Sequence, residues 1–194
     1  MCLSLTSSKA QALRRGDLSG ALIHPAFVPI ATLIGFMYWQ DDHGKFDSGR
    51  EDDLLEAAKA SLMLLRAEST SHDRLLSLMQ AYTLIGWYFV WRNRLALAYD
   101  SFQKAVEIVG RLDLPGLLLA TVNGAADGGR VPGDISMNAW SDEEERVAAF
   151  SQLVFFDRDV HTFKSAKPLL AEEHVMVFLT LKVRGAFGFR ATVH

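Results

Sequence analysis

Histidine and carboxylate side chains could bind a metal ion, but their spacing in this chain does not bring them together. The six histidines are scattered, and no two lie four residues apart, the spacing that places two ligands on one face of a helix. His161 and His174 are the closest pair, and Asp157, Asp159 and His161 would spread around a helix. We therefore predict no metal site, and we interpret 41–43 as a polar turn.

Nucleophilic catalysis would need an activated serine, cysteine or lysine beside a base. The Gly-x-Ser-x-Gly motif of hydrolases is absent from the sequence. Cys2 is the only cysteine, and no neighbouring group is expected to activate it. The carboxylate pairs Glu143–Glu144 and Glu172–Glu173 fit exposed charge at helix ends better than acid–base chemistry. No catalytic residue is predicted, and the residue pattern names no cofactor-binding residue.

Two further groups of residues could bind a ligand. The glycines of 124–133 lack the Lys-Ser or Lys-Thr of a phosphate-binding loop and follow no strand pattern, so a surface loop is expected. The aromatic group Trp87, Tyr88, Phe89 and Trp91 fits either ordinary helix packing or the lining of a ligand cavity.

The elements that must position these residues are predicted to be helices. The first is expected over 30–39, after two prolines and ending before Gln40, with a polar loop over 41–49. A second helix opens with acidic residues at 51–53, which suit a helix N-terminus. Its apolar positions recur at spacings of three and four on one face; they are Leu55, Ala58, Leu62 and Leu65.

The third element, Leu75–Trp91, contains no charged residue, which fits either a short membrane span or a fully buried helix. The polar side chains of Ser77, Gln80 and Thr83 favour the buried helix. A fourth helix runs from Leu95 to the Leu114-Pro115 pair. Its apolar stripe comprises Tyr99, Phe102, Val106, Val109 and Leu112.

A glycine-rich irregular region is expected over 116–140, followed by a capping box at Ser141–Glu144. The helix that the box begins carries an apolar seam and is limited by Pro168; the seam comprises Ala149, Leu153, Phe156, Val160 and Phe163. Asp157 and Arg158 are predicted to form a structural ion pair. Beyond Pro168, 175–181 fits a helix or a strand equally well.

Composition agrees with one helical domain. A length of 194 residues suits a single core. The formal charge of −3 is too balanced to point to nucleic acid, an anionic membrane or an acidic substrate. A single cysteine excludes intrachain disulfides and favours a reducing compartment. Residues 1–12 lack the apolar run of a secretory signal. We predict an all-α fold, an irregular bundle of about five to six helices.

Three segments, in order, resemble the middle homology region of fungal transcription factors that carry a binuclear zinc cluster. His24–Tyr38 resembles the His-Pro helix that opens this region. Leu75–Leu114 is similar to its paired helices, and Glu144–Arg158 looks like its Glu-Arg, aromatic, Asp-Arg helix. The resemblance covers 22–170.

One part of the fourth helix has an alternative interpretation. Ala98–Ala105 is close to the second helix of a tetratricopeptide (TPR) unit, so the bundle is expected to contain TPR-like helix pairs in part. A repeat protein should show the pattern again about 34 residues away, and the sequence contains no second copy. A helical protein-interaction scaffold of this type remains the alternative function.

The resemblance implies a regulatory helical domain in the nucleus that acts in regulation of RNA polymerase II transcription, without catalysis. The domain is expected over 22–170 and to be incomplete, after a flexible lead-in at 1–21 and before an atypical tail at 171–194. Zinc and DNA would be bound only by the family's cysteine-rich cluster, which a chain with Cys2 alone lacks. The other partners expected are an effector metabolite or a co-regulator protein, and a second copy of the chain; no membrane partner is expected.

Overall fold

The protein is an all-α helical bundle, as its sequence predicts. The computed structural model describes residues 24–68, 71–114, 116, 142–164, 168–170, 172, 175 and 176, with side chains at all of these except 142–144, 163 and 164. Five helices and no strand occur in these ranges. The predictions for 1–21, for the glycine-rich region, for the Ser141–Glu144 cap and for most of the tail concern residues outside the described part of the chain.

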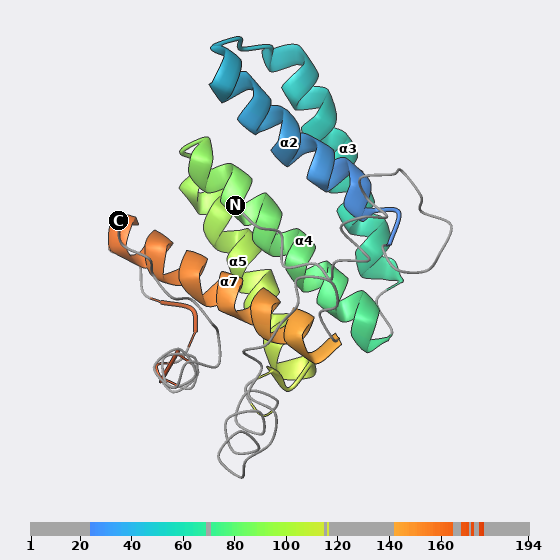
Figure 1. Ribbon diagram of the computed structural model, residues 1–194, viewed down its shortest axis with the longest axis vertical. Helices are drawn as coiled ribbons and strands as arrows, with labels where there is room; N and C mark the ends of the chain where they lie inside the picture. Colours follow the sequence, from blue (N-terminus) through green and yellow to red (C-terminus); the bar gives the residue numbers. More distant parts are fainter. Residues whose placement is uncertain are drawn as a thin grey trace, which may run out of the picture.

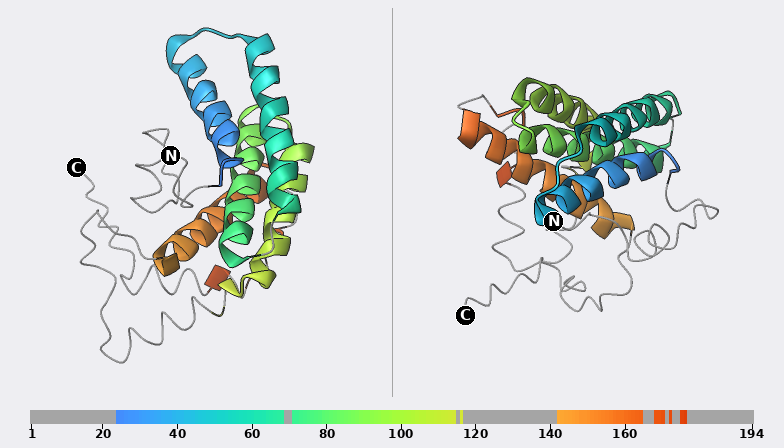
Figure 2. Two further views of the ribbon diagram at one scale, coloured as in Figure 1. Left: turned by 90° about the vertical axis from the view of Figure 1, so that its right-hand side faces the viewer. Right: turned by 90° about the horizontal axis from the view of Figure 1, so that it is seen from above.

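The helices form two antiparallel hairpins and a fifth helix that lies across the second one (Figure 1). Helices α2 (Phe27–His43) and α3 (Ser48–Ala67) make the first hairpin. Helices α4 (His72–Trp91) and α5 (Leu95–Arg111) make the second, and α7 (Asp142–Lys164) packs on it. The left-hand view in Figure 2 shows α2 and α3 projecting together beyond the second hairpin.

Helix α4 is the centre of the bundle, because it contacts each of the other four helices. Its side chains are buried almost all the way round, from Leu75 to Phe89. This explains why 75–89 contains no charged residue: almost every face of this part of the helix meets protein. In the part of the chain that the structure describes, no helix is long and apolar enough to span a bilayer.

The boundaries of the first hairpin differ from the prediction. The expected stop before Gln40 is wrong, and so is the polar turn at 41–43, because α2 continues through His43. Gly44 ends it with a φ of 60°, a left-handed conformation that glycine adopts without strain. Helix α3 then begins at Ser48, where the Asp47 carboxylate caps it by accepting a hydrogen bond from the Arg50 amide at 3.1 Å.

The second hairpin is closed by small residues. A Cβ atom at Gly86 of α4 would lie 2.7 Å from the Phe102 ring of α5. On α5, Ala98 and Ala105 are fully buried on either side of Phe102. The two helices therefore approach closely at Gly86, and the Phe102 ring fills the space that a larger side chain would need.

Helix α7 covers this hairpin with the apolar seam predicted for it. Four of the five predicted seam residues are buried, namely Ala149, Leu153, Phe156 and Val160; the fifth, Phe163, lies outside the described side chains. The seam contacts both α4 and α5. Since α7 is far from both in sequence, it closes the core by long-range packing.

Candidate functional site

A buried polar cluster joins the two hairpins. It comprises Gln40 of α2, Glu51 of α3, Tyr88 of α4 and Arg92 at the end of α4, and is called the Arg92 cluster below. Arg92 donates from Nε and Nη2 to the two carboxylate oxygens of Glu51, at 2.7 and 2.8 Å, and from Nη2 to Gln40 Oε1 at 3.2 Å. The Tyr88 hydroxyl donates to Glu51 Oε1 at 2.7 Å.

The Arg92 cluster is shielded from water, which strengthens its charge interactions. Only 6% of the Glu51 side chain and 17% of the Arg92 side chain are exposed. Burial and the hydrogen bond to Glu51 raise the pKa of Tyr88 far above its usual range. For Arg92, burial lowers the pKa, but the hydrogen bonds and negative charge of Glu51, helped by Asp41, outweigh it, so the net shift is upward. The Glu51 side chain is therefore held between two donors, Tyr88 and Arg92.

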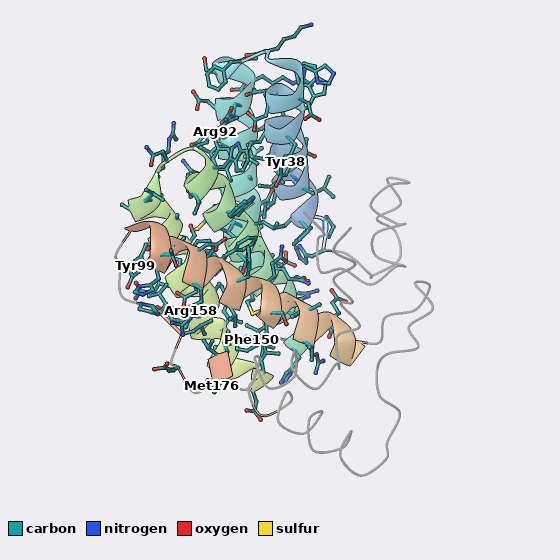
Figure 3. All side chains as sticks on the ribbon, turned by 60° about the vertical axis from the view of Figure 1, so that its left-hand side comes forward. Tyr38, Arg92, Tyr99, Phe150, Arg158 and Met176 are labelled. Atoms are coloured by element: carbon teal, nitrogen blue, oxygen red, sulfur yellow. The ribbon has the colours of Figure 1, made fainter. Side chains whose placement is uncertain are left out.

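An aromatic row runs beside the Arg92 cluster, from α2 across α4 to α7. Its rings follow one another in contact, in the order Tyr38, Trp91, Trp87, Phe156 and Phe155. The centroids of neighbouring rings lie between 4.5 and 6.0 Å apart, the usual range for aromatic pairs. Figure 3 labels Tyr38 and Arg92 close together beside the first hairpin.

Trp87 is the junction of the aromatic row. Its ring stacks on Phe156 of α7 with centroids 4.5 Å apart, and its indole nitrogen donates to the Tyr38 hydroxyl of α2 at 3.3 Å. Trp91 is 46% exposed and donates to the Asp41 carboxylate at 2.6 Å. The row thus offers apolar ring surface, a hydroxyl and a carboxylate, which suit binding by stacking and hydrogen bonding.

The aromatic group found in the sequence is divided between core and surface. Tyr88 and Phe89 are buried, Trp87 is half-buried and Trp91 is exposed. Helix packing therefore explains the first two residues, while Trp87 and Trp91 keep ring surface available for a ligand or partner.

The expected ion pair between Asp157 and Arg158 does not form. Asp157 is buried, and its two carboxylate oxygens accept hydrogen bonds from the backbone amides of Leu169 and Leu170, at 2.9 and 3.2 Å. Arg158 leaves its Nε buried without a hydrogen-bond partner. Neighbours in a helix point in different directions, so this pair was badly placed to interact. The role of Asp157 is instead to fix the segment after α7.

Among the described residues, no three histidine, cysteine or carboxylate groups lie together in a way that could hold a metal ion. Asp159 and His161 remain on α7, whereas Cys2 and His174 fall outside the described part of the chain. The Asp41 carboxylate binds Trp91, and His43 stacks on Trp39 with centroids 4.9 Å apart. Asp41 and His43, at the exposed end of α2, are therefore engaged with the rings of Trp91 and Trp39.

Sequence reasoning missed the Arg92 cluster. The sequence indicates Glu51 only as a charge that favours a helix N-terminus, and it predicts no role for Arg92. One signal could have found the pair: Glu51 lies four residues before Leu55 and seven before Ala58, so it extends their buried stripe. A charged residue at a core position requires a partner, and Arg92 is that partner.

Comparison of the chain with protein-family models, with curated proteins and with solved structures finds no match.

Proposed function

We propose that the chain is the regulatory helical domain of a fungal transcription factor of the binuclear zinc cluster class, acting without catalysis in regulation of RNA polymerase II transcription. One observation carries the proposal: Trp87 contacts Tyr38 through a hydrogen bond and Phe156 through stacking. These three residues belong to the three segments that resemble the family. Segments far apart in the sequence thus meet at one residue, as expected if the resemblance reflects a common core.

The same geometry suits a regulatory switch. The first hairpin meets the rest of the bundle partly through the Arg92 cluster, whose hydrogen bonds require close positioning of Glu51 and Arg92. An effector metabolite or a co-regulator that binds beside the aromatic row would shift the bundle between helix packings if it bound one packing more tightly. The DNA contact would belong to the family's cysteine-rich module, and the site of action would be the nucleus.

A reporter assay tests this function. The chain is fused to an unrelated DNA-binding domain and expressed in a fungal host. Two quantities are measured: transcription from a reporter gene that carries the binding site of that domain, and the fraction of the fusion that lies in the nucleus. We expect the fusion to enter the nucleus and change reporter output. Trp91→Ala should alter that output, because Trp91 lies in the aromatic row, while Trp39→Ala should not.

Trp39 is a matched control, since its 43% exposure is close to the 46% of Trp91 and its ring contacts are with Phe36 and His43. A fusion that leaves the reporter unchanged would contradict the proposal. Equal effects of Trp91→Ala and Trp39→Ala would contradict the role of the aromatic row in this function.

A helical protein-interaction scaffold is the second candidate. It is favoured by the close approach of α4 and α5 at Gly86, where Phe102 packs between buried Ala98 and Ala105. Small residues at such positions are typical of TPR helix pairs. Binding of a defined peptide by the purified chain, with no reporter effect of the fusion, would favour this function.

A further inference from the structure

His24 connects the start of α2 to the end of α3. Its Nε2 atom lies 3.0 Å from Oε2 of Glu68, the residue that follows α3. Its Nδ1 atom lies 3.2 Å from the backbone nitrogen of Ala26, the N-cap residue of α2. Pro25 has no amide hydrogen, so the Ala26 amide is the first backbone donor after the ring. Only 14% of the His24 side chain is exposed, so the ring is largely shielded from water.

Glu68 also binds α4. Its backbone carbonyl accepts a hydrogen bond from Arg74 Nη1 at 3.2 Å, and the same nitrogen lies 3.4 Å from Glu68 Oε2. The hydrogen bond from His24 lowers the pKa of Glu68, and the charge of Arg74 lowers it further. Glu68 is therefore ionised at neutral pH, and its carboxylate can only accept hydrogen bonds. Among the described residues, the charged groups that face His24 are Glu68 and, through it, Arg74.

These partners determine which nitrogen of the neutral His24 ring carries the hydrogen. A backbone amide can only donate, so Nδ1 accepts from Ala26 and carries no hydrogen. An ionised carboxylate can only accept, so Nε2 carries the hydrogen and donates to Glu68. The neutral ring with its hydrogen on Nε2 is therefore the form that satisfies both partners.

Protonation of the ring is incompatible with one of the two contacts. An imidazolium carries a hydrogen on both nitrogens, so Nδ1–H and the Ala26 N–H would be two donors 3.2 Å apart with no acceptor between them. The contact with Glu68 keeps its hydrogen bond and gains an attraction between opposite charges. The protonated ring therefore stays with Glu68, and the Ala26 amide loses its partner.

We propose that His24 is a proton-dependent switch at the start of α2. The neutral ring joins the Ala26 amide to Glu68, and protonation releases the amide while the ring remains bound to Glu68. Histidine side chains change charge between about pH 5 and 8, whereas Glu68 and Arg74 keep their charges over this range. The start of α2 thus responds to pH near neutrality. This inference does not rest on the proposed function, because it depends only on these contacts.

His43, at the end of α2, is an internal control. Its Nδ1 atom lies 2.9 Å from the backbone carbonyl oxygen of Trp39, which can only accept, so Nδ1 carries a hydrogen. Protonation of His43 adds a hydrogen to Nε2 and leaves this bond intact. The two histidines are therefore expected to carry the hydrogen on opposite nitrogens when neutral, and to differ in their effect on the backbone.

Nuclear magnetic resonance of the nitrogen-15-labelled chain tests the switch. At about pH 8, where histidine is neutral, the ring nitrogen shifts should show the hydrogen on Nε2 of His24 and on Nδ1 of His43. On titration to about pH 5, the Ala26 amide resonance should shift with the same midpoint as the His24 ring. The protection of this amide against hydrogen exchange should fall about five- to tenfold, as expected for one lost hydrogen bond. Protonation of His43 should leave the protection of the last amides of α2 unchanged.

His24→Gln is the matched variant, because glutamine does not titrate and can still donate to Glu68. The Ala26 resonance should then be independent of pH over this range, and circular dichroism should show that the variant is folded. If the variant does not fold, the wild-type titration with His43 as its reference decides. A hydrogen on Nδ1 of neutral His24, or an Ala26 amide that does not follow the titration of His24, would overturn the proposal. An Ala26 shift that persists in His24→Gln would overturn it as well, because another group would then cause it.

Discussion

Arg92 makes three cross-helix hydrogen bonds, two of them to Glu51, and Glu51 depends on it. Replacing Arg92 with methionine keeps most of the packing but leaves a buried carboxylate with only the Tyr88 hydroxyl as donor. Breaking one partner of a buried pair costs about 3 kcal/mol, and we expect this loss in the free energy of unfolding measured with urea. Arg94→Met, two residues away and exposed, should change it by less than about 0.5 kcal/mol. Equal losses would contradict the role given to the cluster.

Tyr88 predicts a pH dependence at the same site. Its pKa is raised in the folded state, so folding retains a proton that the unfolded chain releases above about pH 10. The stabilisation is complete below that pH and is lost as the pH rises toward the folded-state pKa. Melting temperatures between pH 8 and about 11.5 should therefore fall more steeply for the wild type than for Tyr88→Phe. Parallel curves would show that the Tyr88 hydroxyl contributes nothing to the loss of stability at high pH.

Between elements, the close contact of α4 and α5 depends on a single glycine. In Gly86→Ala the new methyl group would lie 2.7 Å from the buried Phe102 ring, so the helices must separate or the ring must move. We expect a loss of about 1–3 kcal/mol in the free energy of unfolding, as for other overpacked cores. Gly35→Ala is the matched control, because a Cβ atom there meets nothing within 4 Å. It should stabilise α2 by roughly 0.5–1 kcal/mol, and a similar gain at Gly86 would contradict the close approach.

The difference between local spacing and contacts between distant residues explains how much of the structure the sequence could predict. Apolar spacing predicted the helices and their buried faces, for example Leu55, Ala58 and Leu65 on α3, because local periodicity reflects burial directly. It missed the Arg92 cluster, because the cluster depends on partners elsewhere in the chain. It also missed the end of α2, although Gly44 marks that end locally. The Asp41 carboxylate, assigned to a turn, binds Trp91, and no local pattern shows a contact between residues 50 positions apart.

At the scale of the whole molecule, the five described helices form two units that are held together in different ways. The α2–α3 hairpin joins α4 through the Arg92 cluster and the apolar residues around it. Helix α7 joins the α4–α5 hairpin through its apolar seam, in which Phe156 stacks on Trp87 and lies tilted against Phe102. Loss of one junction should therefore loosen one unit before the other.

Phe156→Ala tests this division. Phe156 is buried, and its truncation removes the ring contacts of α7 with Trp87 of α4 and Phe102 of α5, at a cost of about 3–5 kcal/mol. Hydrogen exchange followed by mass spectrometry should show faster exchange in α7 and in the facing parts of α4 and α5, with α2 and α3 little changed. Phe155→Ala is the neighbouring control, and its 58% exposed ring should leave the exchange of α7 almost as in the wild type. Uniformly faster exchange in all five helices would mean that the bundle opens as a single cooperative unit, and a ligand bound at the aromatic row could then not move one hairpin independently of the other.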